Sequence, residues 1–483
     1  MTSRREVVAQ VRSAEPATIA RDALSGGKPV WIVGGAVRDA LFGSEVVDLD
    51  LAVPTGSEER TARSVAAAAK GVAFELSAGH GTWRVVSMDR SWHLDVAGLR
   101  AGDIEGDLRL RDFTVNAIAT LLGSDDEVLI DPTGGEGDAE GRILRAASSR
   151  SFSDDPLRLL RAARIASSYG LSLDPQTVEL ARAGSDRAGE PAGERQFAEF
   201  SQIMSCEDPV HGLGLLDQLG VTSYLLPELE ALRGVGQNRN HHLDVYGHTL
   251  AVLGQLLEAE SNLAEFAGSE AERLDELLDE VIAEEVTRRT ALRIGALFHD
   301  IGKPATRREE DGMVTFIGHD QVGAEITLGI CDRFRVGRRL TAYLSALVRS
   351  HLRLGFLIHE RPLTKRRIYD YLSACEPVAA DVTLLSVADR LSARGSGPIA
   401  SDEMVRSHLD LAREMFIPAL DWHHDGPPRP PIDGNAIVEA LGIAPGPEVG
   451  EIIEELRAAA YAGELSGPEE ALRIARELAD GRR

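Results

Sequence analysis

The stretch "GGAVRDALFGSEVVDLDLAV", residues 34–53, decides how the first part of the chain is expected to fold. It follows the apolar run "PVWIV", so a buried strand, a glycine turn and a helix over "AVRDALFG" are predicted in that order. The stretch ends in "VVDLDLAV", which is typical of a second strand. Asp48 and Asp50 occupy alternate positions there. They are therefore expected to project to one face of the strand, roughly 7 Å apart.

Two carboxylates on one face of an apolar strand need a positive partner, because burying an ionised carboxylate is costly. Such a pair can share two divalent ions spaced about 4 Å apart. Mg²⁺ suits this role, because it prefers oxygen ligands and substrate phosphates often complete its coordination. The alternative is an edge strand with two solvated acids. Gly34 and Gly35 favour the metal interpretation, since a glycine turn before a helix presents backbone N–H groups to an anion. Arg38 adds positive charge for a triphosphate.

The composition restricts the function classes. The 483 residues carry a formal net charge of −25, which argues against a generally basic nucleic-acid coat, so any RNA contact must use local basic surface. Cys206, Cys331 and Cys375 lie far apart in no metal-ligand spacing, which predicts buried thiols in a reducing compartment. No apolar run reaches membrane length and no signal core is present near Met1. We therefore expect a cytoplasmic protein without a membrane partner.

The pattern of elements changes along the chain. Strands and helices alternate up to about residue 145, with one helix predicted over 3–25, and almost every periodic segment after Asp155 is helical. This predicts an α/β head with a mixed sheet and helices, followed by an all-α remainder. The expected segments are a head, 1–146; a helical neck and RNA-binding region, 147–235; a helical domain, 236–424; and a linker with a helical tail, 425–483.

A second motif, "SDDPLRLLRAARIA", places an acid before a row of arginines. Asp155 lies at the expected helix start, and Arg158, Arg161 and Arg164 recur every three residues. A carboxylate accepts from an exocyclic amine, whereas a guanidinium donates to a ring nitrogen or carbonyl. Asp155 and Arg158 could therefore accept cytosine and adenine and reject uracil and guanine. Arg161 and Arg164 would hold phosphates or support that pair. The alternative is a solvated basic helix face.

A third group of residues lies in the helical part. "LFHDIGKPAT" puts His299 beside Asp300 at the end of an apolar helix. Imidazole and carboxylate ligands suit a catalytic transition metal with open positions, whose bound water would be the nucleophile. A single core histidine is more often a satisfied polar residue, but the His-Asp pair followed by Gly302 and Lys303 favours a metal site. His248 lies upstream of this pair, and His319, His351 and Asp389 lie downstream of it.

The motifs together resemble a known family. "GGAVRDALFG…DLDLAV", "LDVAGLR", "RDFTVNAIA", "DPTGGEGD" and "DDPLRLLRAARIA" resemble those of the class II, bacterial-type tRNA nucleotidyltransferases, which are the CCA-adding enzymes and their poly(A) polymerase relatives. The matches follow the family's order over roughly residues 30–170. The histidine pattern resembles the HD superfamily of metal phosphohydrolases. The resemblance implies a nucleotidyltransferase head, a helical neck, an HD-type helical domain and a helical tail.

The resemblance also implies a reaction and a role for each matching residue. The 3′-hydroxyl of a tRNA would attack the α-phosphate of CTP or ATP without a nucleic-acid template. The implied roles are Mg²⁺ ligation by Asp48 and Asp50, a third catalytic carboxylate at Asp95, triphosphate contacts at Gly34, Gly35, Arg38 and Arg111, base selection by Asp155 and Arg158, support by Arg161 and Arg164, and metal ligation in the HD site by His248, His299, Asp300 and Asp389, with His319 and His351 open.

Two departures from the family pattern concern whether this chain would add the terminal A of the CCA end. Leu110 stands where the family usually has an arginine, and only ten residues separate Arg100 from Arg111. The family normally has a longer flexible loop there, associated with the switch from CTP to ATP, and a short loop resembles enzymes that add only the two cytidines.

Two further functions are compatible with these motifs. One is that of a poly(A) polymerase, which the acidic C-terminal part disfavours. The second is that of an HD phosphohydrolase whose head only binds RNA. Nucleotide addition to tRNA is the function that the motifs favour most.

Overall fold

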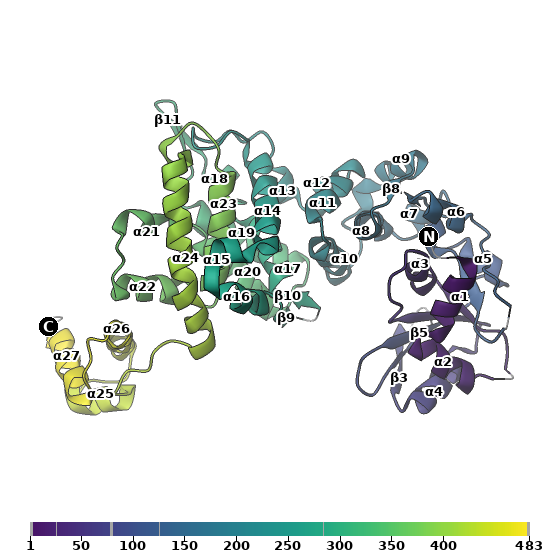
Figure 1. Cartoon of the computed structure of the whole chain (residues 1–483), viewed down its shortest axis with the longest axis horizontal. Coiled ribbons are helices and arrows are strands. Elements are labelled where there is room, and N and C mark those ends of the chain that lie inside the picture. The colour runs from purple at the N-terminus through teal and green to yellow at the C-terminus, as the bar shows by residue number, and fades with distance from the viewer. Residues whose placement is uncertain (1–2, 26, 78–80, 125, 284, 481–483) are drawn as a thin grey trace. The chain divides into compact units, whose positions relative to one another are not determined.

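The computed structural model describes residues 3–25, 27–77, 81–124, 126–283 and 285–480, and the chain divides into two compact units, Met1–Leu225 and Leu226–Arg483. The elements of both units are labelled in Figure 1. The finer division into four segments stays a prediction.

A six-stranded mixed sheet forms the centre of the first unit. Its strand order is β3-β4-β5-β2-β1-β6, and β2 and β5 pair in parallel, whereas the other neighbours are antiparallel. The strands are β1 (Trp31–Val33), β2 (Leu49–Val53), β3 (Val72–Ser77), β4 (Thr82–Val86), β5 (His93–Gly98) and β6 (Ala119–Leu121).

The central strand β2 is shorter than the apolar run from which it was predicted. Leu49, Leu51 and Val53 are buried, and Asp50 is the one partly exposed residue of the strand. Asp48 lies at a bend immediately before β2 rather than inside it. The prediction that both acids lie in one strand is therefore confirmed for Asp50. It is wrong for Asp48, which lies one residue before the strand begins.

Helices pack against this sheet. Helix α4 contacts β3, β4 and β5, and α2 packs on α4. The single helix expected over residues 3–25 is wrong, because the chain is extended at Ala14 and a second helix begins at Glu15. Pro16 explains the break, since it has no N–H to donate to the preceding turn. The helices here are α1 (Arg4–Ser13), α2 (Glu15–Ala23), α3 (Gly35–Leu41), α4 (Glu58–Ala69), α5 (Ile104–Leu108) and α6 (Gly135–Glu140).

The rest of the first unit is helical apart from a short parallel pair of strands. Helices α8, α10 and α11 pack on one another around buried Leu160, Phe200, Ile203 and Leu216. The elements are β7 (Ile143–Leu144), α7 (Ser151–Asp154), α8 (Arg158–Tyr169), β8 (Ser172–Leu173), α9 (Pro175–Ala183), α10 (Gly193–Ser205), α11 (Pro209–Gln218) and α12 (Thr222–Leu225).

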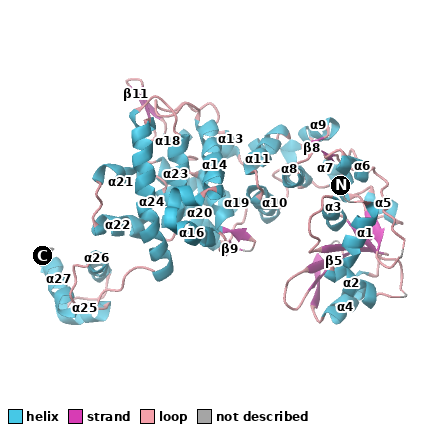
Figure 2. Ribbon diagram, viewed as in Figure 1, coloured by secondary structure: helices cyan, strands magenta, loops and turns pink. Residues whose placement is uncertain are grey.

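The second unit is built from helices, with two short ribbons, as Figure 2 shows. Helices α14, α17, α20 and α23 pack around an apolar core that includes Leu253, Ile294, Leu347 and Leu385. The elements up to the histidine-rich part are α13 (Pro227–Glu230), α14 (Val245–Ser261), α15 (Leu263–Ala267), α16 (Ala271–Leu278), β9 (Val281–Ala283), β10 (Val286–Thr287), α17 (Arg288–Phe298), α18 (Lys303–Thr306), β11 (Arg308–Glu310), β12 (Met313–Thr315), α19 (His319–Arg333) and α20 (Arg338–Ser350).

The chain ends in a long helix and a small three-helix group with a core of its own, which includes Ile437, Ile452, Leu456 and Ala475. None of the helices within the described residues is both long enough and apolar enough to span a bilayer. The remaining elements are α21 (Arg353–Leu357), α22 (Lys365–Cys375), α23 (Ala379–Ser392), α24 (Asp402–Asp425), α25 (Gly434–Leu441), α26 (Pro447–Ala462) and α27 (Pro468–Asp480).

Candidate functional site

The turn between β1 and α3 brings Gly34 against the side chain of Arg111. Gly34 has a φ of 74°, and a Cβ there would lie 2.6 Å from Nη1 of Arg111 and 3.3 Å from Oδ2 of Asp50. Glycine is required here, because it alone combines this backbone conformation with such close contacts. Gly35 then begins α3. The structure thus brings together the turn, one predicted arginine and one predicted acid.

The three predicted carboxylates gather at the start of β2 and β5. Parallel pairing places Asp50 directly opposite Asp95, so their side chains share a face of the sheet. Asp95 accepts two hydrogen bonds of 2.8 Å from Arg84 on β4. Asp48 lies 2.7 Å from Nδ1 of His93 and accepts a 3.0 Å hydrogen bond from the backbone N–H of that residue. Asp48 and Asp95 therefore each have a positive or donating partner.

Asp50 is the acid that lacks a donor. Within the described part of the chain its carboxylate accepts no hydrogen bond. Burial raises the pKa of Asp50, and the Asp95 carboxylate raises it further, whereas the Arg111 guanidinium opposes them. A partly buried acceptor beside a second carboxylate is costly unless a cation meets it. Oxygen donors of this kind suit a hard divalent cation, so the arrangement fits the predicted metal site.

Arg38 is held firmly beside the turn. Its Nη1 donates to Asn116 Oδ1 at 3.0 Å, and its Nε and Nη2 donate to Asp39 at 2.8 and 2.6 Å. The hydroxyl of Tyr169 on α8 donates to the same Asp39 oxygen at 2.5 Å, and the Arg38 guanidinium lies 4.8 Å from the Tyr169 ring centroid. The structure therefore places Arg38 where it was predicted, but with each of its three nitrogens already paired.

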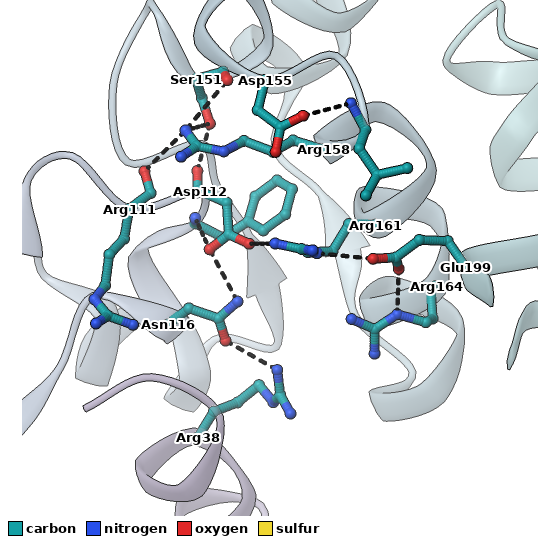
Figure 3. Close-up of polar contacts among 12 residues, drawn as sticks. Arg38, Arg111, Asp112, Asn116, Ser151, Asp155, Arg158, Arg161, Arg164 and Glu199 are labelled. Atoms are coloured by element: carbon teal, nitrogen blue, oxygen red, sulfur yellow. Dashed lines mark hydrogen bonds and ion pairs between the residues drawn. The ribbon is translucent and has the colours of Figure 1, made fainter. Parts of the chain in front are cut away.

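The residues of the predicted base-reading pair lie near each other, but each has other hydrogen-bond partners in this structure. The Arg158 guanidinium donates to the carbonyls of Ser151, at 3.2 Å, and Arg111, at 3.5 Å (Figure 3). It also donates to the carbonyl of Leu110 at 3.2 Å. The Asp155 carboxylate accepts from the backbone N–H of Leu157 at 3.1 Å and from Arg195 at 3.3 Å. The helix start predicted at Asp155 lies three residues later, because Asp155 ends α7 and α8 begins at Arg158 with Leu157 as its N-cap. The guanidinium is nevertheless occupied by backbone acceptors from the segment before Arg111.

Arg161 and Arg164 belong to an ion-pair network that the sequence motifs did not reveal (Figure 3). Glu199 on α10 accepts from Arg161 at 3.0 Å and from Arg164 at 2.6 Å, and Arg161 also lies 3.2 Å from Asp112. Both arginines are thus engaged in ion pairs, and their roles as phosphate contacts or as supports of the pair stay predictions.

Asp112 and Asn116 connect this network to Arg38. Asn116 donates to Asp112 at 3.0 Å and accepts from Arg38. Burial favours a raised pKa for Asp112, but Arg161 and the hydrogen bond from Asn116 outweigh it and hold the pKa at about 2. Asp112 and Asn116 could have been noticed by their spacing of four residues in "RDFTVNAIA". Glu199 lies in the segment "GERQFAEF", which the motifs did not single out.

All six predicted metal-site residues of the second unit meet in one cluster, which we call the histidine cluster. They divide into two groups of three residues, and within each group the ligand atoms all lie within 4.8 Å of one another. The groups are His248, His299 and Asp389, and Asp300, His319 and His351. Each residue lies on, or directly after, one of the helices α14, α17, α19, α20 and α23.

The contacts within the histidine cluster link imidazoles to carboxylates. His248 Nε2 lies 3.0 Å from Asp389, and His299 Nε2 lies 3.1 Å from Asp300. Lys303 donates to Asp300 at 2.6 Å. Burial lowers the pKa of His351 to about 4, and the neighbouring His299 contributes to this. Burial would also lower the pKa of His299, but the carboxylates of Asp300 and Asp389 outweigh it and raise that pKa. Imidazole and carboxylate are the ligand types that transition metals bind, so this donor set fits such a metal.

Comparisons with known proteins agree with this geometry. Residues 30–145 match the family described as "Poly A polymerase head domain", residues 170–232 match "Probable RNA and SrmB- binding site of polymerase A", and residues 245–394 match "HD domain".

Similar full-length proteins include an A-adding tRNA nucleotidyltransferase of Deinococcus radiodurans, 35% identical over 91% of this chain and 93% of that protein. A CC-adding tRNA nucleotidyltransferase of Thermus thermophilus is 32% identical over 92% of each. A solved structure of a CCA-adding enzyme with ATP shares the fold, with a TM-score of 0.64 and 20% identity over 98% of this chain and 97% of that one. This chain belongs to the tRNA nucleotidyltransferase family.

Proposed function

We propose that this protein adds C or A nucleotides to the 3′ end of tRNA, using CTP or ATP and Mg²⁺, in the cytoplasm. The observation that carries the proposal is Asp50, a donor-free acid opposite Asp95 and against the Gly34 turn. Asp48 and Asp50 would be the Mg²⁺ ligands. At such a site Mg²⁺ supplies charge neutralisation on the phosphates and a lowered pKa for the attacking hydroxyl.

The residues around this site would bind and orient the triphosphate. The N–H of Gly34 donates to the carbonyl of Ile118 at 3.3 Å, so the backbone donors proposed for an anion are those from Gly35 onward, at the start of α3. Arg111 would neutralise a phosphate beside them, and Arg38 would hold the turn through Asn116 and Asp39. We infer that Arg38 acts mainly by positioning, because its guanidinium nitrogens are already engaged.

Base selection by Asp155 and Arg158 would need a rearrangement. Arg158 has to exchange the carbonyls of Ser151 and Leu110 for the edge of a cytosine or adenine. Leu110 lies directly before Arg111, so the segment that delivers one triphosphate contact also holds the base-reading arginine. Base selection and triphosphate binding would therefore be coupled through this segment.

The segment from Arg100 to Arg111 is short and well tied down, in contrast to the flexible loop that the family usually has. It contains α5, which Asp103 caps by accepting from the N–H of Gly106 at 2.8 Å. Buried Asp107 accepts from the backbone N–H and the Nε of Arg100 at 3.0 Å each. A segment held in this way has little freedom to switch the site between two bases. We infer that this chain carries out only one of the two steps, addition of CC or addition of A.

Two tRNA substrates test this inference. One ends at the discriminator base and the other ends in CC, and each is incubated with α-labelled CTP, ATP and Mg²⁺. We expect only one of them to be extended, by two residues for a CC-adding enzyme or by one for an A-adding enzyme. Product length on a sequencing gel measures the result.

The same gel separates the possible activities. A complete CCA end built on the first substrate would contradict the single-step inference while leaving nucleotide addition intact. Long A tails on both substrates and on unrelated RNA would instead identify a poly(A) polymerase. No incorporation from either nucleotide, with a folded protein, would refute the proposed function.

A second function, metal-dependent hydrolysis of phosphate esters, is favoured by the histidine cluster. His299 and Asp300 would be metal ligands, and Lys303 lies beside them as a cation for a phosphate group. Hydrolysis of p-nitrophenyl phosphate, its bis ester and 2′,3′-cyclic AMP in the presence of Co²⁺ or Ni²⁺ tests this. We expect hydrolysis that Asp300→Ala abolishes and that Asp50→Ala leaves unchanged. Hydrolysis that survives Asp300→Ala would refute it.

A further inference from the structure

A cavity of about 580 Å³ lies in the first unit, at the end of β2 that is remote from the Gly34 turn. Its walls come from the end of α2, the segment before β1, the end of β2 and one face of α4, and we call it the α4 cavity. Val33 pairs with Asp50 beside the turn, whereas Val53 ends β2 three residues later, about 10 Å along the strand. The α4 cavity is therefore separate from the carboxylates and the turn of the proposed nucleotidyl-transfer site.

One face of α4 supplies most of the polar wall of the α4 cavity. Residues spaced i, i+3, i+4 and i+7 lie on the same side of a helix. The lining residues with this spacing are Ser57, Arg60, Thr61 and Ser64. Lys28 lines the same cavity from the segment between α2 and β1. Two cations and several hydroxyl groups therefore border one space.

The charge of this wall differs from that of the chain as a whole. The sequence holds 77 acids against 52 lysines and arginines, yet no acid is among the described residues that line the α4 cavity. The two acids at the start of α4 are engaged elsewhere: Glu58 accepts from the backbone N–H two residues before it at 3.0 Å, and Glu59 pairs with Arg63 at 2.7 Å. Lys28 and Arg60 form no ion pair with any described residue. Cations without a counter-charge beside a concave surface attract an anion.

The hydroxyl of Ser57 is a second, independent indication of a ligand. Ser57 is 4% exposed, and its Oγ has no hydrogen-bond partner among the described residues. A serine directly before a helix commonly accepts from the first turn, but the Ser57 side chain makes no such bond with α4. A buried hydroxyl without a partner costs free energy unless a polar group meets it. An anion in the cavity would accept the proton of this hydroxyl.

The remaining walls of the α4 cavity are apolar. They include Leu24, Val30 and Val53. An apolar lining with a few polar groups, in a volume of about 300–1,000 Å³, is typical of pockets for small organic molecules. An inorganic phosphate would contact only the cationic wall, whereas an organic phosphate would also cover the apolar one.

We propose that the α4 cavity binds a small organic phosphate of about the size of a mononucleotide. Lys28 and Arg60 would pair with its phosphate group, Ser57 would donate to the same group, and the apolar walls would contact the organic part. The first unit would then hold a phosphate-binding site besides the one at the Gly34 turn. This site does not depend on the proposed nucleotidyl transfer.

Calorimetric titration of the full-length protein with AMP in EDTA tests the proposal. AMP has no triphosphate, and EDTA removes the Mg²⁺ on which the proposed transfer site relies. We expect one AMP per chain, and weaker binding of inorganic phosphate. Lys28→Ala combined with Arg60→Ala is expected to weaken AMP binding about tenfold or more, because charge-assisted hydrogen bonds are lost. Both side chains are exposed, so the double variant is expected to fold.

Matched variants locate the bound AMP. Arg63→Ala removes a cation of α4 that does not line the cavity, and it should leave the affinity unchanged. Arg111→Ala removes a cation of the proposed triphosphate site and should also leave it unchanged. Ser57→Ala should weaken AMP binding without unfolding the protein, because it removes a buried hydroxyl that has no partner.

Three outcomes would overturn the proposal. The first is that the unaltered protein binds no AMP, or binds inorganic phosphate as tightly. The second is that Arg111→Ala weakens AMP binding while the Lys28 and Arg60 double variant does not, which would place AMP at the Gly34 turn. The third is that the double variant weakens binding of tRNA but not of AMP, which would assign the two cations to an RNA surface. Nucleotide incorporation into tRNA, measured separately, decides the proposed function in each case.

Discussion

Replacing Asp50 by alanine is expected to lower nucleotide incorporation into tRNA by about three orders of magnitude or more, and Asp48→Ala is expected to have the same effect. A metal at a phosphoryl-transfer site supplies several kcal/mol of transition-state stabilisation, and about 1.4 kcal/mol corresponds to tenfold in rate. Asp50 has no donor of its own, whereas Asp95 opposite it is paired with Arg84 and Asp48 with His93, so neither of these acids is expected to replace it as a ligand. Incorporation of α-labelled nucleotide at saturating Mg²⁺ measures the loss.

Removing the charge of Asp50 should increase the stability of the fold, although it abolishes activity. A partly buried carboxylate without a donor destabilises the fold in the absence of a cation, so Asp50→Asn is expected to raise the unfolding temperature in EDTA. Glu179, an exposed acid on α9, serves as the control, and Glu179→Ala should change neither activity nor unfolding temperature. Full incorporation by Asp50→Ala would show that this acid is no metal ligand.

The sequence predicted the elements of the first unit better than the directions of its side chains. The strand, turn and helix around Gly34 follow from local apolar pattern and glycine conformation, and they are confirmed as β1, the turn and α3. Asp50 and Asp95 also belonged to the predicted set, but their direct opposition depends on the parallel pairing of strands 45 residues apart. No local pattern contains that register.

The base-reading residues show where local reasoning ends. The helix start at Asp155 and Arg158 could be predicted from composition and spacing. The direction of Arg158 could not, because its acceptors include the carbonyl of Leu110, which lies 48 residues earlier in the chain. For the same reason the spacing of Arg161 and Arg164 left phosphate binding and support of the pair both open, and it could not reveal their pairing with Glu199, 38 and 35 residues later in the chain.

The histidine cluster shows the opposite case. His299 and Asp300 were predicted from their adjacency, and four distant residues were added through a resemblance. The fold adds that these six residues form two groups, and that the two oxygens of the Asp300 carboxylate face different histidines. The helix ends that carry His299, His319 and His351 orient these rings alike, because each returns its Nδ1 to a carbonyl three residues before it.

Glu199→Ala is expected to lower the free energy of unfolding by about 3–5 kcal/mol, the range for removing one partner of a buried ion pair. Glu199 is buried and it accepts from Arg161 and Arg164 through separate oxygens. Arg161 keeps Asp112 as a partner, so most of the loss is expected to come from Arg164, for which the described residues offer no second acceptor. Chemical denaturation followed by circular dichroism measures the change.

Matched variants show whether the charge or the shape of Glu199 matters. Glu199→Gln keeps one accepting oxygen, so it should lose less than the alanine variant, about 1–3 kcal/mol for one unsatisfied group. Glu190 forms a pair of the same type with Arg187 on the exposed surface, and Glu190→Ala should leave the denaturation midpoint unchanged. Because Arg161 reaches Asp112, and Asp112 reaches Asn116 and Arg38, the Glu199 variants should also weaken nucleotide binding at temperatures where they remain folded. A raised KM for the nucleotide with an unchanged kcat would identify that effect, whereas an unfolding midpoint equal to that of Glu190→Ala would show that the network contributes nothing to the fold.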